Sequence, residues 1–270
     1  MPSVDDSKCI LVTGATSGIG RALALALAKL PSHPRVIGTG RRKERLEELN
    51  KIDGIHGVPL DLNTDLDTLK KSTEDLIIRF PDLDTVILNA GIQREVHFKK
   101  PQEINLPDLI EEIGVNYTSN VAFITYVLPH FLKLSAQGRP SFIVTVTSGL
   151  AILPGSFVPN YSASKAALHN FSLSLRAQLH DTNVHVLELI PPLVESELHD
   201  VSGTTEILSK FWMPLDDFTK EAVQGFRKGD HNIPVGVTWK DSFEKYEQGK
   251  EEAVLEMQKR MESVWTRERS

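Results

Sequence analysis

The chain has 270 residues, 40% of them hydrophobic and 24% charged, so it can bury the core of one large domain or two small ones. A net charge of −6, with no stretch of interleaved basic and aromatic residues, argues against nucleic acid as the main partner. No apolar run approaches the roughly 20 residues of a membrane span. The polar, acidic first residues do not resemble a secretory signal, and the single cysteine, Cys9, rules out an intrachain disulfide. We therefore expect a cytoplasmic protein that does not bind membranes.

Short β-branched segments alternate with helical patterns along most of the chain. Strands are predicted at residues 9–13, 35–39, 57–60, 85–91, 141–148 and 184–190, and helices at 21–30, 42–50, 65–80, 104–134 and 159–180. Thr64 is the expected N-cap of the third helix, and Pro81 is expected to end it. This alternation predicts an α/β fold in one domain, with a doubly wound, Rossmann-type parallel sheet and helices on both faces.

Two segments near the end of the chain break this rhythm. Residues 193–235 contain the sequence FWMPLDDF and are predicted to form a helical excursion or lid that covers the substrate. Residues 241–265 are rich in charge and are predicted to form one amphipathic C-terminal helix.

Three glycines follow the first strand, in the pattern Thr13-Gly14-x-x-x-Gly18-x-Gly20. Glycine tolerates a positive φ and lets another group approach closely, and the helix that follows offers its N-terminal N–H groups to an anion. The pattern is typical of a plain strand-to-helix turn and also of a turn that binds a dinucleotide pyrophosphate. The glycines alone leave both readings open.

Four further features lie at strand ends or helix starts. Tyr161 and Lys165 share one face of a predicted helix, one turn apart. Ser148 lies thirteen residues before Tyr161 at the end of a strand, Asn116 starts or interrupts the long helix, and the sequence NAG at 89–91 ends another strand. Ligands bind beyond the carboxyl ends of parallel strands, so this combination favours the dinucleotide reading.

With these motifs, residues 8–200 resemble the short-chain dehydrogenase/reductase family, in its short single-domain branch. The sequence TGATSGIG matches the family's cofactor turn, and LNAG matches its NNAG except for Leu88. The sequence PPLVES at 191–196 matches PGxxxT, with Pro192 in place of Gly and Ser196 in place of Thr. Ser196 could equally be the N-cap of a short helix.

The resemblance implies an oxidoreductase that transfers a hydride between a nicotinamide and a carbonyl or secondary alcohol. It implies a catalytic tetrad of Asn116, Ser148, Tyr161 and Lys165. The cofactor-binding residues that it implies are Gly14, Thr16, Ser17, Gly18, Ile19, Gly20, Arg41, Arg42, Asp61, Leu62, Asn89, Ala90, Gly91, Tyr161, Lys165, Pro191, Val194 and Ser196.

The chemistry of these residue types agrees with those roles. A tyrosine ionises near pH ~10 in water, and the ammonium of Lys165 one turn away is expected to lower the pKa of Tyr161, which then serves as acid/base. Ser148 is expected to bind the substrate oxygen and fix its distance to Tyr161. Asn116 is expected to anchor a chain of water molecules that reprotonates the site through Lys165.

The end of the second strand, GTGRR, bears on the choice between NAD and NADP. Thr39 stands where an acidic residue would bond the ribose 2′-OH of NAD, and Arg41 and Arg42 follow where a 2′-phosphate would lie. The arginines could also be the basic start of an exposed helix, although basic residues are unfavourable there. The sequence therefore predicts NADP(H).

The remaining expectations concern partners. We expect a small-molecule carbonyl or alcohol substrate, no metal site, and a homodimer or homotetramer formed through the helices at 104–134 and 159–180, by resemblance to the family. The alternative to an active enzyme is a non-catalytic NADP-binding regulatory or interaction protein that has kept the fold.

Overall fold

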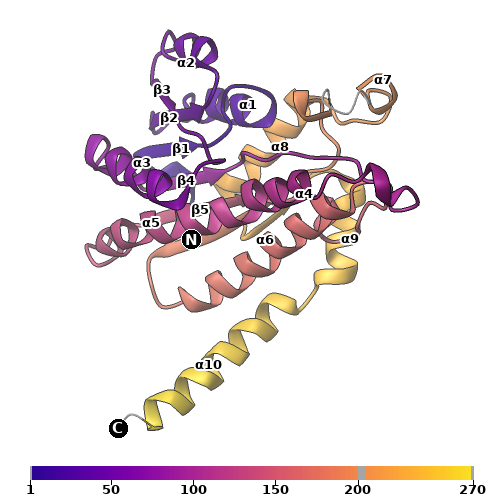
Figure 1. Ribbon diagram of the computed structural model, residues 1–270. Helices are drawn as coiled ribbons and strands as arrows, with labels where there is room; N and C mark the ends of the chain where they lie inside the picture. Colours follow the sequence, from indigo (N-terminus) through magenta and orange to yellow (C-terminus); the bar gives the residue numbers. More distant parts are fainter. Residues whose placement is uncertain (1, 200–204, 269–270) are drawn as a thin grey trace.

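A seven-stranded parallel sheet, in the order β3-β2-β1-β4-β5-β6-β7, forms the centre of the computed structural model, which describes residues 2–199 and 205–268 (Figure 1). This order confirms the predicted doubly wound α/β fold in a single domain, with its switch point between β1 and β4. The strands are β1 (Cys9–Val12), β2 (Arg35–Gly40), β3 (Ile55–Pro59), β4 (Thr85–Leu88), β5 (Ser141–Val146), β6 (Val184–Ile190) and β7 (Asn232–Pro234). The helices are α1 (Gly18–Leu27), α2 (Lys43–Leu49), α3 (Leu66–Arg79), α4 (Leu106–Ile113), α5 (Ser119–Ser135), α6 (Pro159–Gln178), α7 (Thr205–Leu208), α8 (Leu215–Lys228), α9 (Val237–Glu247) and α10 (Lys250–Glu268).

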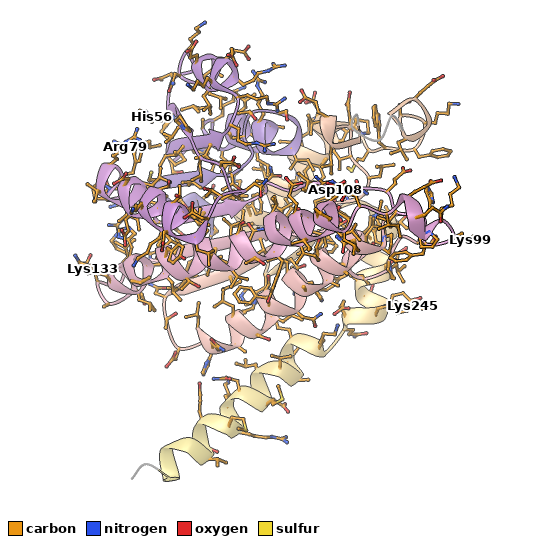
Figure 2. All side chains as sticks on the ribbon, viewed as in Figure 1. His56, Arg79, Lys99, Asp108, Lys133 and Lys245 are labelled. Carbon is orange, nitrogen blue, oxygen red and sulfur yellow. The ribbon has the colours of Figure 1, made fainter. Side chains whose placement is uncertain are left out.

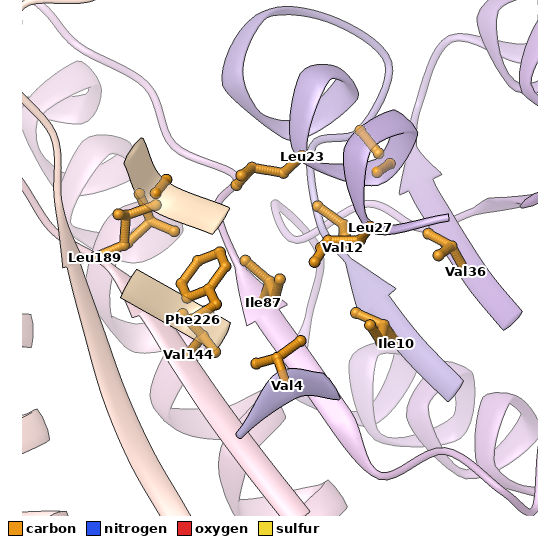
Figure 3. Packing of buried hydrophobic residues seen from close by; sticks show 14 of the residues in the cluster. Val4, Ile10, Val12, Leu23, Leu27, Val36, Ile87, Val144, Leu189 and Phe226 are labelled. Carbon is orange, nitrogen blue, oxygen red and sulfur yellow. The ribbon is translucent and has the colours of Figure 1, made fainter. Parts of the chain in front are cut away.

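Helices cover both faces of the sheet. On one face, Leu23 and Leu27 of α1 and Phe226 of α8 are fully buried against strand residues such as Val12 and Ile87 (Figure 3). Burying each such side chain contributes roughly 1.5–3 kcal/mol, so these contacts fix the helices on the sheet. Helices α3, α5 and α6 contribute the core of the other face. Charged side chains such as those of Lys99, Lys133 and Lys245 lie at the outer edges of the molecule (Figure 2).

The long helix predicted at 104–134 is interrupted. Helices α4 and α5 are joined by a π-helical segment, Gly114–Thr118, that contains Asn116. The prediction that Asn116 starts or interrupts this helix is confirmed, whereas the prediction of one regular helix is wrong.

The N-cap of α3 is one residue later than expected. The Asp65 carboxylate accepts hydrogen bonds from the backbone N–H (2.9 Å) and the hydroxyl (2.7 Å) of Thr68, so Asp65 caps the helix in place of Thr64. A carboxylate can accept both bonds at once, which a threonine hydroxyl at 64 cannot match. The helix ends at Arg79, two residues before Pro81, as predicted.

The segment after β6 is only partly an excursion. The N–H of Met213 donates to the carbonyl of Leu193 (2.8 Å), and the N–H of Glu195 donates to the carbonyl of Met213 (3.1 Å), so residue 213 pairs with the segment that follows β6. Helix α8 then buries Phe218 and Phe226 in the core. The predicted lid boundary at 235 is therefore too late. The described part of the excursion comprises residues 196–199 and 205–212, and residues 200–204 of the predicted lid lie outside the described residues.

The C-terminal region forms two helices instead of the one predicted at 241–265. Helices α9 and α10 are separated at residues 248–249, where Gly249 has a φ of +78° that other residues rarely adopt. Helix α10 lies against α6, and its far end extends away from the rest of the chain (Figure 1). In the described part of the chain, no helix is both long and apolar enough to span a bilayer.

Candidate active site

The turn between β1 and α1 has a shape that requires glycine. Gly14 has a φ of +66°, and a Cβ on Gly20 would lie 2.4 Å from the carbonyl oxygen of Gly14. The turn is fixed to the end of β4, because the Thr13 hydroxyl accepts hydrogen bonds from the backbone N–H groups of Asn89 (2.9 Å) and Ala90 (3.0 Å). The two glycine motifs of the sequence therefore meet at the carboxyl edge of the sheet.

The same turn fits a dinucleotide pyrophosphate. Helix α1 begins at Gly18, and its N-cap Ser17 makes no side-chain bond to the first turn of the helix. The N-terminal N–H groups of α1 thus point toward the turn and can bind an anion. The side chain of Ile19, in the first turn of α1, packs against the core. A Cβ on Gly14 would lie 3.0 Å from Cα of Ala90, and one on Gly20 would lie 2.5 Å from the Asn89 amide nitrogen, so these glycines preserve the shape of the turn.

Arg42, the residue before α2, spans the mouth of this turn. Its guanidinium donates to the hydroxyls of Thr16 (3.1 Å) and Ser17, and it forms an ion pair with Glu197 (2.6 Å). The hydrogen bond from Arg42 holds the pKa of the Glu197 carboxyl below its usual range. Because Glu197 lies in the excursion, the pair ties the excursion to the cofactor turn. Arg41 is exposed beside it.

The sequence suggested that Thr39 faces the turn from β2. In the structure, the residue that faces the turn is Gly40. The Thr39 side chain is 1% exposed, and its hydroxyl lies 3.4 Å from the carbonyl oxygen of Val12. A Cβ on Gly40 would lie 2.6 Å from the Thr16 methyl group. Neighbouring strand side chains point to opposite faces of the sheet, so only one of the two positions can reach the turn.

Two other predicted cofactor residues lie after β3. Asp61 is exposed and accepts a hydrogen bond from the backbone N–H of Asn63 (2.9 Å). The Leu62 side chain is buried, and its carbonyl accepts a hydrogen bond from the Ser119 hydroxyl (2.5 Å). Asp61 is therefore free to meet a ligand, whereas Leu62 can offer a ligand only its backbone.

Tyr161, Lys165 and Ser148 come together at the carboxyl end of β5. The Lys165 ammonium lies 5.6 Å from the centre of the Tyr161 ring and donates to the carbonyl of Val146 (2.7 Å). Ser148 is the second residue after the strand, and its hydroxyl accepts a hydrogen bond from the N–H of Leu150 (3.1 Å). Both helix residues are buried, at 7% and 3% exposure.

Asn116 is fixed by three hydrogen bonds. Its side-chain oxygen accepts from the N–H of Ile92 (2.9 Å), and its amide donates to the carbonyl of Ile92 (2.8 Å) and to the Ser164 hydroxyl (3.0 Å). A Cβ on Gly91 would lie 3.1 Å from this oxygen and 3.6 Å from Nζ of Lys165, so Gly91 leaves the space between the two side chains.

The pKa of Tyr161 moves in the direction opposite to that expected. Burial raises the pKa of Tyr161 to about 12; the Ser148 hydroxyl works against this rise and the Glu112 carboxylate adds to it. Burial also lowers the pKa of Lys165 to about 8, and Glu188 opposes that change. The removal of the charged forms from water is the largest cause of both shifts. Tyr161 is therefore a phenol, able to donate a proton, across the ordinary pH range.

The segment after β6 closes the site from another side. The carbonyl of Pro191 accepts the N–H of Gly149 (2.9 Å), which joins this segment to the residue after Ser148. Val194 is buried in the core. The Ser196 side chain lies beside the turn, because a Cβ on Gly18 would be 3.1 Å from Cβ of Ser196.

Two residues near the site were not predicted. Glu112 is fully buried one helical turn before Asn116, and it accepts hydrogen bonds from the N–H of Arg94 (2.7 Å) and the amide of Asn160 (2.6 Å). Its helical spacing from Asn116 could have revealed it. Trp239 of α9 lies so close to Gly149 that a Cβ there would be 2.2 Å from the indole ring. No local pattern in the sequence indicates that contact.

Within residues 2–199 and 205–268, no group of three or more His, Cys, Asp or Glu side chains is arranged to hold a metal ion.

Comparison with known proteins adds to this geometry. The family model described as short chain dehydrogenase matches residues 8–206. The chain is 36% identical to the uncharacterized oxidoreductase DltE of Bacillus subtilis, over 84% of this chain and 87% of the relative. It is 35% identical to serine 3-dehydrogenase of Rhizobium radiobacter, over 80% of this chain and 85% of the relative.

The fold is also found among solved structures. The closed form of serine dehydrogenase complexed with NADP+ superposes with a TM-score of 0.72 at 26% identity, covering 83% of this chain and 92% of that chain. Solved structures with this fold include complexes with NAD and complexes with NADP. The chain belongs to the short-chain dehydrogenase/reductase family of oxidoreductases.

Proposed function

We propose that this protein is an NADP(H)-dependent oxidoreductase that interconverts a carbonyl compound and a secondary alcohol, with Tyr161 as the acid/base. The observation that carries the proposal is the convergence of Ser148, Tyr161 and Lys165 beside the glycine-rich turn, at the carboxyl edge of the sheet. When bound, the nicotinamide supplies the hydride.

The chain's own residues then handle the oxygen and the proton. Ser148 donates a hydrogen bond to the substrate oxygen and holds it beside the Tyr161 hydroxyl. Tyr161 donates its proton to that oxygen as charge develops there. Lys165 stabilises the resulting phenolate, and Asn116 keeps the neighbouring backbone in place. The raised pKa keeps Tyr161 protonated before the reaction, which is the form that carbonyl reduction needs, and the loss of that proton then depends on Lys165 to stabilise the phenolate.

The preference for NADP(H) rests on Arg42. Its guanidinium lies across the turn and can donate several hydrogen bonds to a 2′-phosphate. Gly40 contributes no carboxylate that would repel such a phosphate. Glu197 forms an ion pair with the same guanidinium, so binding of a 2′-phosphate would displace Glu197 from some of the Arg42 donors.

The Arg42→Ala variant should lower kcat/KM for NADPH at least about tenfold and change kcat/KM for NADH less than about twofold, because only NADPH carries the phosphate. The Glu197→Gln variant should raise the affinity for NADPH, since it frees Arg42. Steady-state kinetics with both cofactors measure these effects, with Arg45→Ala as a matched arginine control. An equal loss for both cofactors in Arg42→Ala would contradict the proposed role.

The substrate that fits best is an uncharged, partly apolar ketone, aldehyde or secondary alcohol. Trp239 covers the residue after Ser148, and Leu153 and Phe157 are exposed on the loop between β5 and α6. We propose that the described parts of the excursion, residues 196–199 and 205–212, serve as a lid over this substrate, and that the Arg42–Glu197 pair helps to hold it near the cofactor turn.

We also propose a two-fold homo-oligomer that uses α4. Leu106 and Ile110 on this helix are 64% and 72% exposed, and a symmetric partner would bury both. Because α10 lies against α6, that helix offers less free surface than the sequence suggested. Sedimentation velocity at micromolar concentration should give a dimer or tetramer, and Ile110→Glu should yield monomers. A monomeric wild-type protein would remove this proposal.

The test of the function is a screen in which NADPH oxidation is followed against a panel of aldehydes and ketones. At least one carbonyl should give turnover that depends on Tyr161. A protein that binds NADPH but turns over no member of a broad panel would point to the non-catalytic alternative.

A further inference from the structure

Two titratable side chains near the end of β5 are buried in the core. Glu188 of β6 is fully buried and His169 of α6 is 2% exposed. Nδ1 of His169 lies 2.9 Å from both carboxylate oxygens of Glu188, and the Thr147 hydroxyl donates to the same carboxylate (2.5 Å). A buried carboxylate with this set of partners is held in one position.

The C-terminal helices extend this cluster to the surface. Nε2 of His169 lies 3.0 Å from a carboxylate oxygen of Glu247, the last residue of α9, and Lys250 forms an ion pair with Glu247 (2.5 Å). With a carboxylate on each ring nitrogen, the pKa of His169 is raised in spite of burial, which lowers it. The cluster thus runs from the buried Glu188 carboxylate through the His169 ring to Glu247 and Lys250.

The cluster adjoins Lys165 along two paths. Lys165 lies one turn before His169 on α6, so their side chains share a face of that helix. The Lys165 ammonium bonds the carbonyl of Val146, and Thr147, the next residue, bonds Glu188. Two of the residues that bond the Glu188 carboxylate, Thr147 and His169, therefore lie on the strand end and the helix that also hold Lys165.

We propose that Glu188 is a positioning residue that acts as the counter-ion of Lys165 and keeps it charged in the buried site, with His169 and Glu247 holding Glu188 in place. The relevance of this charge to turnover rests on the proposed function, whereas the pairing of charges does not. A buried ammonium without a counter-ion would lose its proton near neutral pH. Lysine could then no longer stabilise a phenolate.

The other charged groups near Lys165 cannot take this role. Tyr161 is neutral in its usual form, and the Glu112 carboxylate faces Tyr161 from α4 and is occupied by Arg94 and Asn160. Glu247 contacts the opposite nitrogen of the His169 ring from Glu188, on the side of the ring that leads to Lys250. Among the described residues, Glu188 has an electrostatic effect on Lys165 that favours its charged form.

The experiment measures the pKa of Lys165 directly, by NMR titration of the full-length protein labelled with ¹³C at the lysine ε-carbons. Lys165→Met identifies the signal. Glu188→Gln is expected to lower the pKa of Lys165 by about one unit or more, as loss of a nearby opposite charge should. Glu188→Asp keeps the negative charge but places it farther from Lys165, because the side chain is shorter. The pKa of Lys165 in this variant should lie between those of the wild type and Glu188→Gln.

Two controls separate charge from packing. Thr147→Val removes a hydrogen bond to Glu188 but no charge, and should leave the pKa within about 0.3 units. Glu247→Gln weakens the docking of α9 but keeps Glu188, and its shift should be less than half of that in Glu188→Gln. An unchanged pKa in Glu188→Gln, or an equal shift in Glu247→Gln, would overturn the proposal.

If Glu188→Gln does not fold, the Asp variant decides the matter: a lowered pKa supports the proposal and an unchanged one overturns it. A lowered pKa in a protein without reductase activity would refute the proposed function alone. In an active enzyme, the charged form of Lys165 is lost at a lower pH in Glu188→Gln. The alkaline decline of kcat/KM should therefore move to lower pH by the same amount.

Discussion

Replacing Tyr161 with Phe should lower kcat for carbonyl reduction by about 10²–10⁴-fold, the usual contribution of a positioned acid. The change removes one hydroxyl from a ring that is otherwise 7% exposed, so the packing around it should persist. NADPH affinity should change less than about tenfold, because this hydroxyl is proposed to act on the substrate. Stopped-flow turnover and fluorescence titration with NADPH measure the two quantities.

Tyr117→Phe is the matched control for that variant. Tyr117 lies in the π-helical segment, and its ring meets Phe171 edge-on at 6.2 Å. Losing its hydroxyl should leave kcat within about twofold of wild type. Turnover above a few per cent of wild type in Tyr161→Phe would show that the proton comes from another group.

Thr39→Asp should unfold the protein more readily without changing its cofactor preference. The side chain is 1% exposed and its hydroxyl faces the carbonyl of Val12, which cannot donate a hydrogen bond to a carboxylate. An unpaired buried charge at this position should cost about 3–5 kcal/mol of the free energy of unfolding. Urea denaturation measures the loss, and Thr39→Val, which loses only a hydroxyl, should cost about 1 kcal/mol.

The position that can change the cofactor preference is Gly40. Gly40→Asp, combined with Thr16→Ser to remove the methyl group in its way, would place a carboxylate at the turn beside Arg42. NADPH should lose kcat/KM relative to NADH in that double variant. A stable Thr39→Asp variant that prefers NADH would show that the strand end can rotate and that our placement of Thr39 is wrong.

The fold could be predicted because its signals are local. Runs of β-branched residues that alternate with helical patterns leave few topologies other than a doubly wound sheet, and the glycines and Tyr161–Lys165 mark its carboxyl edge. The distinction between Thr39 and Gly40 could not be predicted in the same way. It depends on where β2 meets the turn, and a shift of one residue reverses the face of each side chain.

Features that depend on distant contacts were also missed. The aromatic residues at 211–226 look alike in the sequence, but Phe211 is exposed whereas Phe218 and Phe226 are core residues of α8. Glu188 lies within the mostly apolar strand β6, and its partner His169 lies on another element, so neither position alone indicates the pair. The break at Gly249 did carry a local signal, since glycine inside a charged helical pattern favours a helix end.

The π-helical segment Gly114–Thr118 changes the direction in which side chains project from the continuous helix formed by α4 and α5. Each residue of an α-helix advances the side-chain direction by about 100°, and a π turn holds one residue more than an α turn. Because of this offset, α4 can aim Glu112 toward the loop of Arg94 while α5 aims Phe123 and Phe131 at the sheet. The continuous helix thereby directs side chains to two different surfaces of the protein. A regular α-helix of the same length would not direct both sets of side chains to these surfaces.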